Sequence, residues 1–280
     1  MLKTISAYAA LLAGAAASPV LAQDSGFDRD SHFDGPYVQI FGGVAAQPSD
    51  KEDSIVFDTN GDDDYVDTVS TATGTNAFVA FCEGRATSTD RTTGCSNDKD
   101  RKEYGGRIGF DKRMGNLVFG LLVEGSANDV LDGTSGFSGT PASYTLTRGL
   151  DYSIAGRARA GFTPNGGALF YATGGIGYAR LTHDFTTTNG VNSFTENNDD
   201  KMVWGYQLGG GAEVMLTDNI SLGLEYLFNR YKDDQYFVQA GTGTAGATNP
   251  FVVSGGQVRM QPSSENFTYS SFRATLGFRF

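Results

Sequence analysis

Eight charged residues lie on the polar phase of segments in which polar and apolar residues alternate. Alternate side chains of an extended strand point to one side, so the four acids and four bases would share enclosed polar faces. A buried charge without a partner costs several kcal/mol. We therefore interpret the set as a salt-bridged network and not as catalytic machinery; it comprises Arg107, Asp111, Glu124, Arg157, Arg159, Glu213, Glu225 and Arg273.

Acid-base chemistry would have to use the two histidines, His32 and His183. His32 lies in a polar N-terminal segment, where we expect no ordered site. His183 precedes Asp184 and could orient a serine, as in a lipid-modifying enzyme, but no serine motif accompanies it. We therefore expect no enzyme activity and no cofactor, with a lipid-directed enzyme as a distant alternative.

The stretch from Gln47 to Asp100 is strongly acidic, with 12 acids and 4 bases. Within it Asp58, Asn60, Asp62 and Asp64 are spaced like the start of a calcium loop. The match is incomplete, because Asp63 replaces the glycine and Val69 the glutamate that such a loop requires. Two interpretations stay open, a solvated acidic loop and a weak site for a divalent ion.

Cys82 and Cys95 belong to the same acidic stretch, with 12 residues between them. In an exported chain, an even and closely spaced pair of cysteines predicts a disulfide. A zinc site would need more ligands than these two residues.

The first 22 residues have the layout of a secretory signal. Lys3 precedes an apolar stretch from Ile5 to Ala17, which is followed by a small-residue cleavage site at residues 20–22. We expect residues 1–22 to be a signal peptide and residues 23–34 a periplasmic segment. The apolar stretch is shorter than the roughly 20 residues of a membrane-spanning helix. The formal net charge of −11 makes nucleic acid an unexpected partner.

Eight alternating segments follow, each close to the length of a tilted transmembrane strand, about 9–11 residues. We place them at 36–46, 102–113, 117–128, 150–162, 168–182, 201–216, 220–232 and 267–280. Tight turns at 114–116, 163–167 and 217–219 alternate with long connections at 47–101, 129–149, 183–200 and 233–266. This pattern predicts an all-β domain over residues 35–280, an eight-stranded antiparallel transmembrane up-and-down β-barrel with short periplasmic turns and long extracellular loops.

The last segment shows the two faces directly. Phe272, Leu276 and Phe278 fall on one face, which we expect to meet lipid, whereas Arg273 and Thr275 fall on the other, which we expect to line the lumen.

The chain resembles the small outer-membrane β-barrel proteins, of the outer membrane immunogenic protein type and more distantly the OmpA transmembrane domain and OmpX. The resemblance covers about residues 35–280. It rests on Pro36-Tyr37-Val38, on Tyr171–Ala179 (YATGGIGYA), Leu208–Val214 (LGGGAEV) and Leu222–Tyr226 (LGLEY), and on the terminal Phe280. It implies no catalytic residues, and it implies that Phe280 acts as an assembly signal for the barrel-assembly machinery. The usual signal has a glycine where this chain has Thr275.

These observations predict a structural and surface-interaction protein with a plugged polar lumen, exposed as a surface antigen in the outer membrane of a Gram-negative bacterium. The alternative is a small-solute or ion porin. Expected partners are outer-membrane lipids, lipopolysaccharide, the barrel-assembly machinery and an extracellular partner reached through the loops.

Overall fold

The computed structural model describes residues 32–47, 53–98 and 100–280. The predicted signal peptide and most of the predicted periplasmic segment lie outside the described residues.

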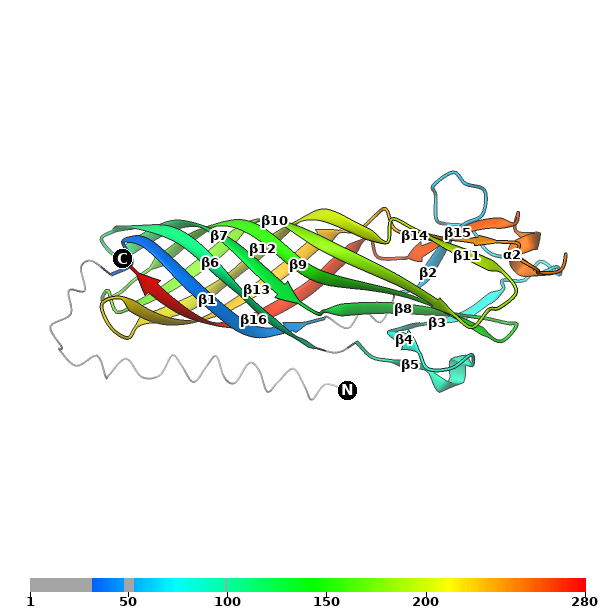
Figure 1. The fold of residues 1–280 in the computed structure, drawn as a ribbon, viewed down its shortest axis with the longest axis horizontal. Helices are drawn as coiled ribbons and strands as arrows, with labels where there is room; N and C mark the ends of the chain where they lie inside the picture. Colours follow the sequence, from blue (N-terminus) through cyan, green and yellow to red (C-terminus); the bar gives the residue numbers. More distant parts are fainter. Residues whose placement is uncertain (1–31, 48–52, 99) are drawn as a thin grey trace.

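Eight antiparallel strands form a closed ring, as the alternation predicts (Figure 1). Each strand is hydrogen-bonded to the next, and the ring closes where the first strand pairs with the last, from Tyr37↔Arg279 to Ala46↔Ser270. In order around the ring they are β1 (Gly35–Ala46), β6 (Arg101–Met114), β7 (Leu117–Asn128), β9 (Ala142–Phe162), β10 (Ala168–Thr187), β12 (Asp200–Met215), β13 (Ile220–Lys232) and β16 (Asn266–Arg279).

Tight turns join neighbouring strands at one end of the barrel, at the three predicted places. Gly115 and Gly166 take positive φ values of 64° and 71° there, a conformation that glycine adopts without steric cost. The pairs β6–β7 and β12–β13 keep one register along their length, whereas the register of β9–β10 shifts between Arg180 and Leu181, far from the turn.

The four long connections at the other end are folded, and they contain strands that the alternating pattern did not predict. Strands β9 and β10 continue beyond the predicted ends, and β8 (Leu131–Ser138) and β3 (Phe78–Glu83) extend the same sheet. A second sheet has the order β11 (Ser193–Asn197), β14 (Phe237–Gly241), β15 (Gln257–Pro262) and β2 (Ile55–Asp58). We call this part, residues 53–98, 129–149, 183–200 and 233–265, the cap.

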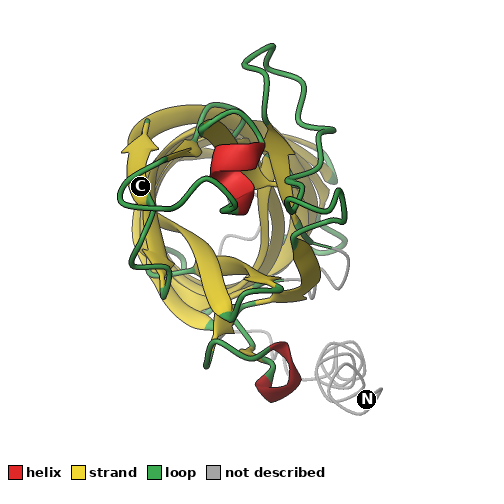
Figure 2. Cartoon of the chain, turned by 90° about the vertical axis from the view of Figure 1, so that its right-hand side faces the viewer, coloured by secondary structure: helices red, strands yellow, loops and turns green. Residues whose placement is uncertain are grey.

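The two sheets of the cap enclose an apolar core of their own. Phe78, Tyr144, Val238 and Met260 are among its buried members. The short helix α2 (Pro250–Val253) contributes the buried Phe251, and it lies in front of the ring of strands when the barrel is viewed end-on (Figure 2). The cap is therefore a small β-sandwich built on the barrel.

The cap also contains a hairpin of β4 (Arg85–Ala86) and β5 (Cys95–Ser96), which lies near β3 and β8 and has the 3-10 turn η1 (Arg91–Thr93) between its strands. In the described part of the chain, no helix is long and apolar enough to cross a membrane.

Candidate functional site

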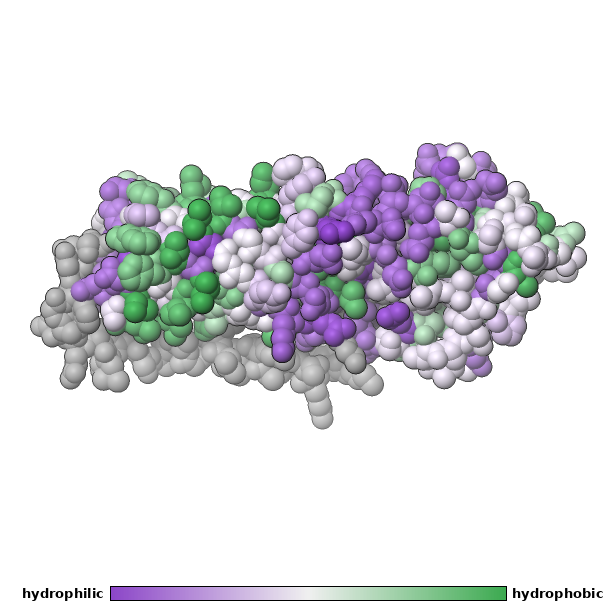
Figure 3. Space-filling model, viewed as in Figure 1, coloured by the Kyte–Doolittle hydropathy of each residue, from purple (hydrophilic) through white to green (hydrophobic). Residues whose placement is uncertain are grey.

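The outer surface of the barrel strands is apolar. Ile40, Leu121 and Ile176 are 64%, 70% and 62% exposed, and Figure 3 shows apolar side chains gathered over the barrel, with strongly polar ones between them and the cap. Aromatic residues mark both limits of this band: Tyr104, Tyr152, Trp204, Tyr206 and Tyr226 toward the cap, and Phe110, Phe119, Phe162, Phe170, Phe278 and Phe280 toward the turns. Such aromatic girdles lie at membrane interfaces.

The lumen side of the same strands is charged, and all eight residues of the predicted network lie there buried. In the half near the turns, two arginines and two acids form a closed ring. Arg159 binds Asp111 through Nε at 2.7 Å and Glu213 at 3.2 Å. Arg279 binds the same two acids at 2.8 and 2.9 Å. Each carboxylate is thus shared by two guanidinium groups.

A second cluster occupies the half toward the cap. Glu225 accepts from Arg107 at 2.8 Å and from Arg157 at 3.2 Å. The hydroxyl of Tyr171 donates to the same carboxylate at 2.9 Å. Glu225 is therefore the acid on which two arginines and a tyrosine converge.

Arg273 completes this second cluster. It binds Glu124 at 2.8 Å and Glu103 at 2.6 Å, and Glu124 also pairs with Arg157. The network that we predicted lacked Glu103 and Arg279. The signal was present in the sequence, because Glu103 shares the phase of Arg107 and Asp111, and Arg279 shares that of Arg273.

Apolar layers lie on either side of the charged network. Leu150, Leu181, Tyr231, Phe267 and Tyr269 are among the buried residues of the layer toward the cap. The layer toward the turns consists of Phe33, Val118, Leu169 and Tyr171, with Met215 packed against them. The charges are thus enclosed between two plugs of packed side chains.

His183 lies in the cap. Its Nε2 is 3.0 Å from Asp233, its Nδ1 is 3.2 Å from the carbonyl oxygen of Asp199, and its ring stacks on Tyr236 with centroids 4.1 Å apart. Burial raises the pKa of the Asp233 carboxyl, but the contacts with His183 and Arg148 together hold it below its usual value. Both ring nitrogens thus contact other residues of the cap, which indicates a structural role.

His32 is ordered, contrary to our expectation for the N-terminal segment. It is buried, and its Nδ1 lies 3.0 Å from the carbonyl oxygen of Gly166. The polar composition of the segment gave no sign that it folds against the barrel.

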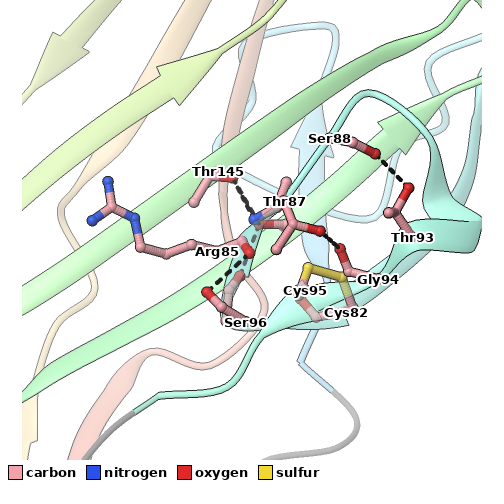
Figure 4. Close-up of a disulfide and its surroundings, with 12 residues drawn as sticks. Cys82, Arg85, Thr87, Ser88, Thr93, Gly94, Cys95, Ser96 and Thr145 are labelled. Carbon is pink, nitrogen blue, oxygen red and sulfur yellow. Dashed lines mark hydrogen bonds between the residues drawn. A yellow bond between two sulfur atoms is a disulfide. The ribbon is translucent and has the colours of Figure 1, made fainter.

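Cys82 and Cys95 are joined in the predicted disulfide, with Cα atoms 6.2 Å apart (Figure 4). The bridge links β3 to the hairpin of β4 and β5. The hairpin is also held on the main sheet, because the amide of Ala86 donates to Ser135 at 2.9 Å and lies 3.3 Å from the hydroxyl of Thr145. The disulfide and these bonds fix the hairpin over the outer face of β8 and β9.

The calcium-like spacing forms a turn. The Asp58 carboxylate accepts from the amides of Asn60 and Gly61 at 3.1 and 2.6 Å, and Arg259 lies 3.6 Å from it. Within the described ranges, no group of three or more His, Cys, Asp or Glu side chains is arranged to hold a metal ion. The carboxylates of this segment instead satisfy backbone amides.

A closed ring of eight strands with an apolar outer band, aromatic girdles and a charged lumen requires a bilayer around it. The chain is a small eight-stranded outer-membrane β-barrel protein. Its apolar band lies against the membrane lipids, the cap is extracellular, and the tight turns are periplasmic.

The chain is similar to a 22 kDa outer membrane protein of Rhizobium leguminosarum bv. viciae, with 27% identity over 156 residues. The match covers 54% of this chain and 63% of that relative. No protein-family model matches. Among solved structures, OprG of Pseudomonas aeruginosa aligns with a TM-score of 0.47 and 10% identity, covering 89% of this chain and 97% of that one. Neisserial surface protein A aligns with a TM-score of 0.36 and 15% identity, covering 88% of this chain and 97% of that one.

Proposed function

We propose that the protein is a non-enzymatic structural and surface-interaction protein whose extracellular cap is the part that meets other molecules. The observation that carries this proposal is the cap itself. Four connections that could have been mobile loops instead form a sandwich with its own apolar core. A preorganised surface binds with a smaller entropic cost than a loop that must be ordered first.

The far end of the cap has an unusual composition. Residues 68–82, 133–147, 185–195 and 235–258 contain no Asp, Glu, Lys, Arg or His, although the chain as a whole is 19% charged. We call these segments the neutral apex. Interface cores are depleted of charge, so this surface favours a partner recognised by shape and by hydrogen bonds to hydroxyl and amide groups.

Hydrogen bonds hold the neutral apex in one shape. Asn192 accepts from Asn189 and from Asn249, both at 3.0 Å, and Asn189 donates to the hydroxyl of Tyr144 at 2.9 Å. Val191 and Val253 are exposed beside these residues. They are the apolar side chains that a partner would cover.

The test is capture of binding partners from the cell envelope and from host cell surfaces by the full-length protein in nanodiscs. The matched control carries Val191→Lys and Val253→Lys, which place charge on the neutral apex without touching the barrel. The proposal predicts a partner retained by the native protein at high salt and lost by the double variant. Equal capture by both proteins would count against the neutral apex as the binding surface.

A small-solute or ion pore is the second candidate, and the charged lumen is the observation that favours it. Two observations argue against a pore. Each lumenal acid among the described residues pairs with at least one arginine, and apolar layers lie at both ends of the network. Ion conduction would require the network and both layers to rearrange.

A further inference from the structure

Phe33 fills the periplasmic mouth of the barrel. The side chain is 0% exposed and packs with Val118, Leu169 and Tyr171. The guanidinium carbon of Arg279 lies 4.8 Å from the centre of its ring, within the range of a cation–π contact. Because Arg279 also binds Asp111 and Glu213, Phe33 lies directly below the charged ring of the lumen.

The neighbours of Phe33 hold it across the mouth. His32 reaches two turns, through Gly166 at 3.0 Å and through the Asp218 carboxylate at 3.4 Å. Arg113 donates to the carbonyl oxygen of His32 at 3.3 Å, and Asp34 pairs with the exposed Lys112 at 3.0 Å. Residues 32–34 thus contact three separate places on the rim.

This segment is not part of the strand ladder of the ring. Pairing of β1 begins at Gly35, opposite Asp111. Residues 32–34 could therefore move away from the barrel mouth without breaking a strand pair of the ring. Gly35 has φ of 109° and can act as the hinge.

Phe33 itself is held in a strained conformation, with φ of 61°. Residues other than glycine rarely adopt this left-handed region, and such strain persists only where the surroundings impose it. Burial of the ring opposes the strain, and release of the segment would relieve it.

We propose that residues 32–34 form a removable stopper of the periplasmic mouth. When the stopper is seated, the lumen is sealed from the periplasm. When it leaves, the ring of Asp111, Arg159, Glu213 and Arg279 becomes accessible to water and small periplasmic solutes, while the barrel and its charge network stay in place. This proposal concerns the periplasmic end and is independent of the role proposed for the cap.

The test measures access to the site behind Phe33. Leu169, buried under Phe33, is replaced by cysteine in the native chain, whose own two cysteines are joined to each other. The folded protein is exposed to a small charged thiol reagent, with and without Phe33→Ala. The matched control is Phe267→Ala, which removes an equally buried ring from the apolar layer at the opposite end.

The stopper predicts slow labelling of Leu169→Cys alone and labelling at least roughly tenfold faster with Phe33→Ala, because local opening governs access to a buried group. Phe267→Ala should leave the slow rate unchanged. Heat-dependent gel mobility reports whether each variant is folded. If Phe33→Ala does not fold, His32→Ala combined with Arg113→Ala loosens the segment and should also raise the rate. Fast labelling without any second substitution, equal rates in all folded variants, or an equal increase with Phe267→Ala would overturn the proposal.

Discussion

The buried charged residues of the lumen balance one another. Among the described residues, the lumenal network has five buried arginines and five buried acids: Arg107, Arg157, Arg159, Arg273 and Arg279, and Glu103, Asp111, Glu124, Glu213 and Glu225. Their charges cancel, so the network is neutral although the whole chain carries −11. Desolvating so many ions is costly, and geometry with several hydrogen bonds per group offsets that cost. Removal of one charged residue should therefore lower the free energy of unfolding by more than its own hydrogen bonds contribute.

Glu225→Ala tests this at the most connected acid. The substitution leaves Arg107 and Arg157 short of a carboxylate and Tyr171 short of an acceptor, so we expect the free energy of unfolding to fall by about 3–5 kcal/mol. The control, Glu265→Ala, removes an exposed glutamate in the cap. Denaturant midpoints of the folded barrels measure both, and equal midpoints would contradict a stabilising network.

Asp98 gives the cap a predictable dependence on pH. Burial, and then the neighbouring Asp132 carboxylate, raise the pKa of Asp98 from 3.8 to about 7. The folded cap therefore holds a proton that the unfolded segment releases above about pH 4. The contribution of Asp98 to stability is favourable at low pH and is lost as the pH rises to about 7.

We expect Asp98→Asn to remove this dependence and to protect the cap at pH values above 7, by about 1 kcal/mol after solvent screening is allowed for. Asparagine can still accept the hydrogen bond from the amide of Gly133, which is 3.3 Å long. Hydrogen exchange of residues 84–98 at low and high pH measures the effect, with the exposed Asp64→Asn as control. Indistinguishable pH profiles for the native protein and Asp98→Asn would refute the role assigned to this carboxyl.

Among the structural elements, the barrel strands could be predicted from sequence because a bilayer and a polar lumen impose strict alternation. The observed ends of β6 and β16, at 101–114 and 266–279, differ by one residue from the predicted 102–113 and 267–280. In the cap the alternation disappears, because β8 and the outer half of β9 are buried on both faces. Tyr144 faces the apolar core, and Thr145 lies under the hairpin of β4 and β5.

The candidate site, too, could be predicted from the sequence only in part. Strand phase placed Arg107 and Glu213 in the lumen, but it could not say which acid pairs with which arginine, because partners come from strands that are distant in sequence. The contact between Asp111 and Arg279 spans 168 residues. The placement of Phe33 depends on a positive φ and on three separate rim contacts, which no periodic pattern encodes.

The disulfide should stabilise one element and not the barrel. A double Cys82→Ser and Cys95→Ser variant loses the link between β3 and the hairpin, worth about 2–4 kcal/mol against local opening. We expect faster proteolytic cutting within residues 85–96 and unchanged heat-dependent gel mobility. Faster cutting elsewhere, or loss of the mobility difference, would show that the bridge supports more than the hairpin.

The end of β16 allows a test of the predicted assembly signal. Phe280 is 70% exposed toward lipid, and we expect Phe280→Ala to lower the amount of protein in the outer membrane without changing its export. Phe278→Ala is the matched control, since it removes an outward ring from the same strand. Equal levels for the two variants would mean that the terminal aromatic residue carries no special signal.

In the whole molecule, three layers follow one another along the barrel axis. They are an apolar layer at the periplasmic end, a network of charged residues with no net charge, and an apolar layer below the cap. The ring is closed by pairing of β1 with β16, so no strand edge is left within the membrane band. The barrel thus carries the cap at its extracellular end, and side chains pack in its lumen, as expected for eight strands.

Conductance of the purified native protein in planar bilayers tests the closed lumen most directly. With all five lumenal acids paired and apolar layers at both ends, the account predicts a silent membrane with rare, small openings, which Glu225→Ala should make more frequent. Steady, ohmic conductance from the folded native barrel would contradict the account and favour the pore.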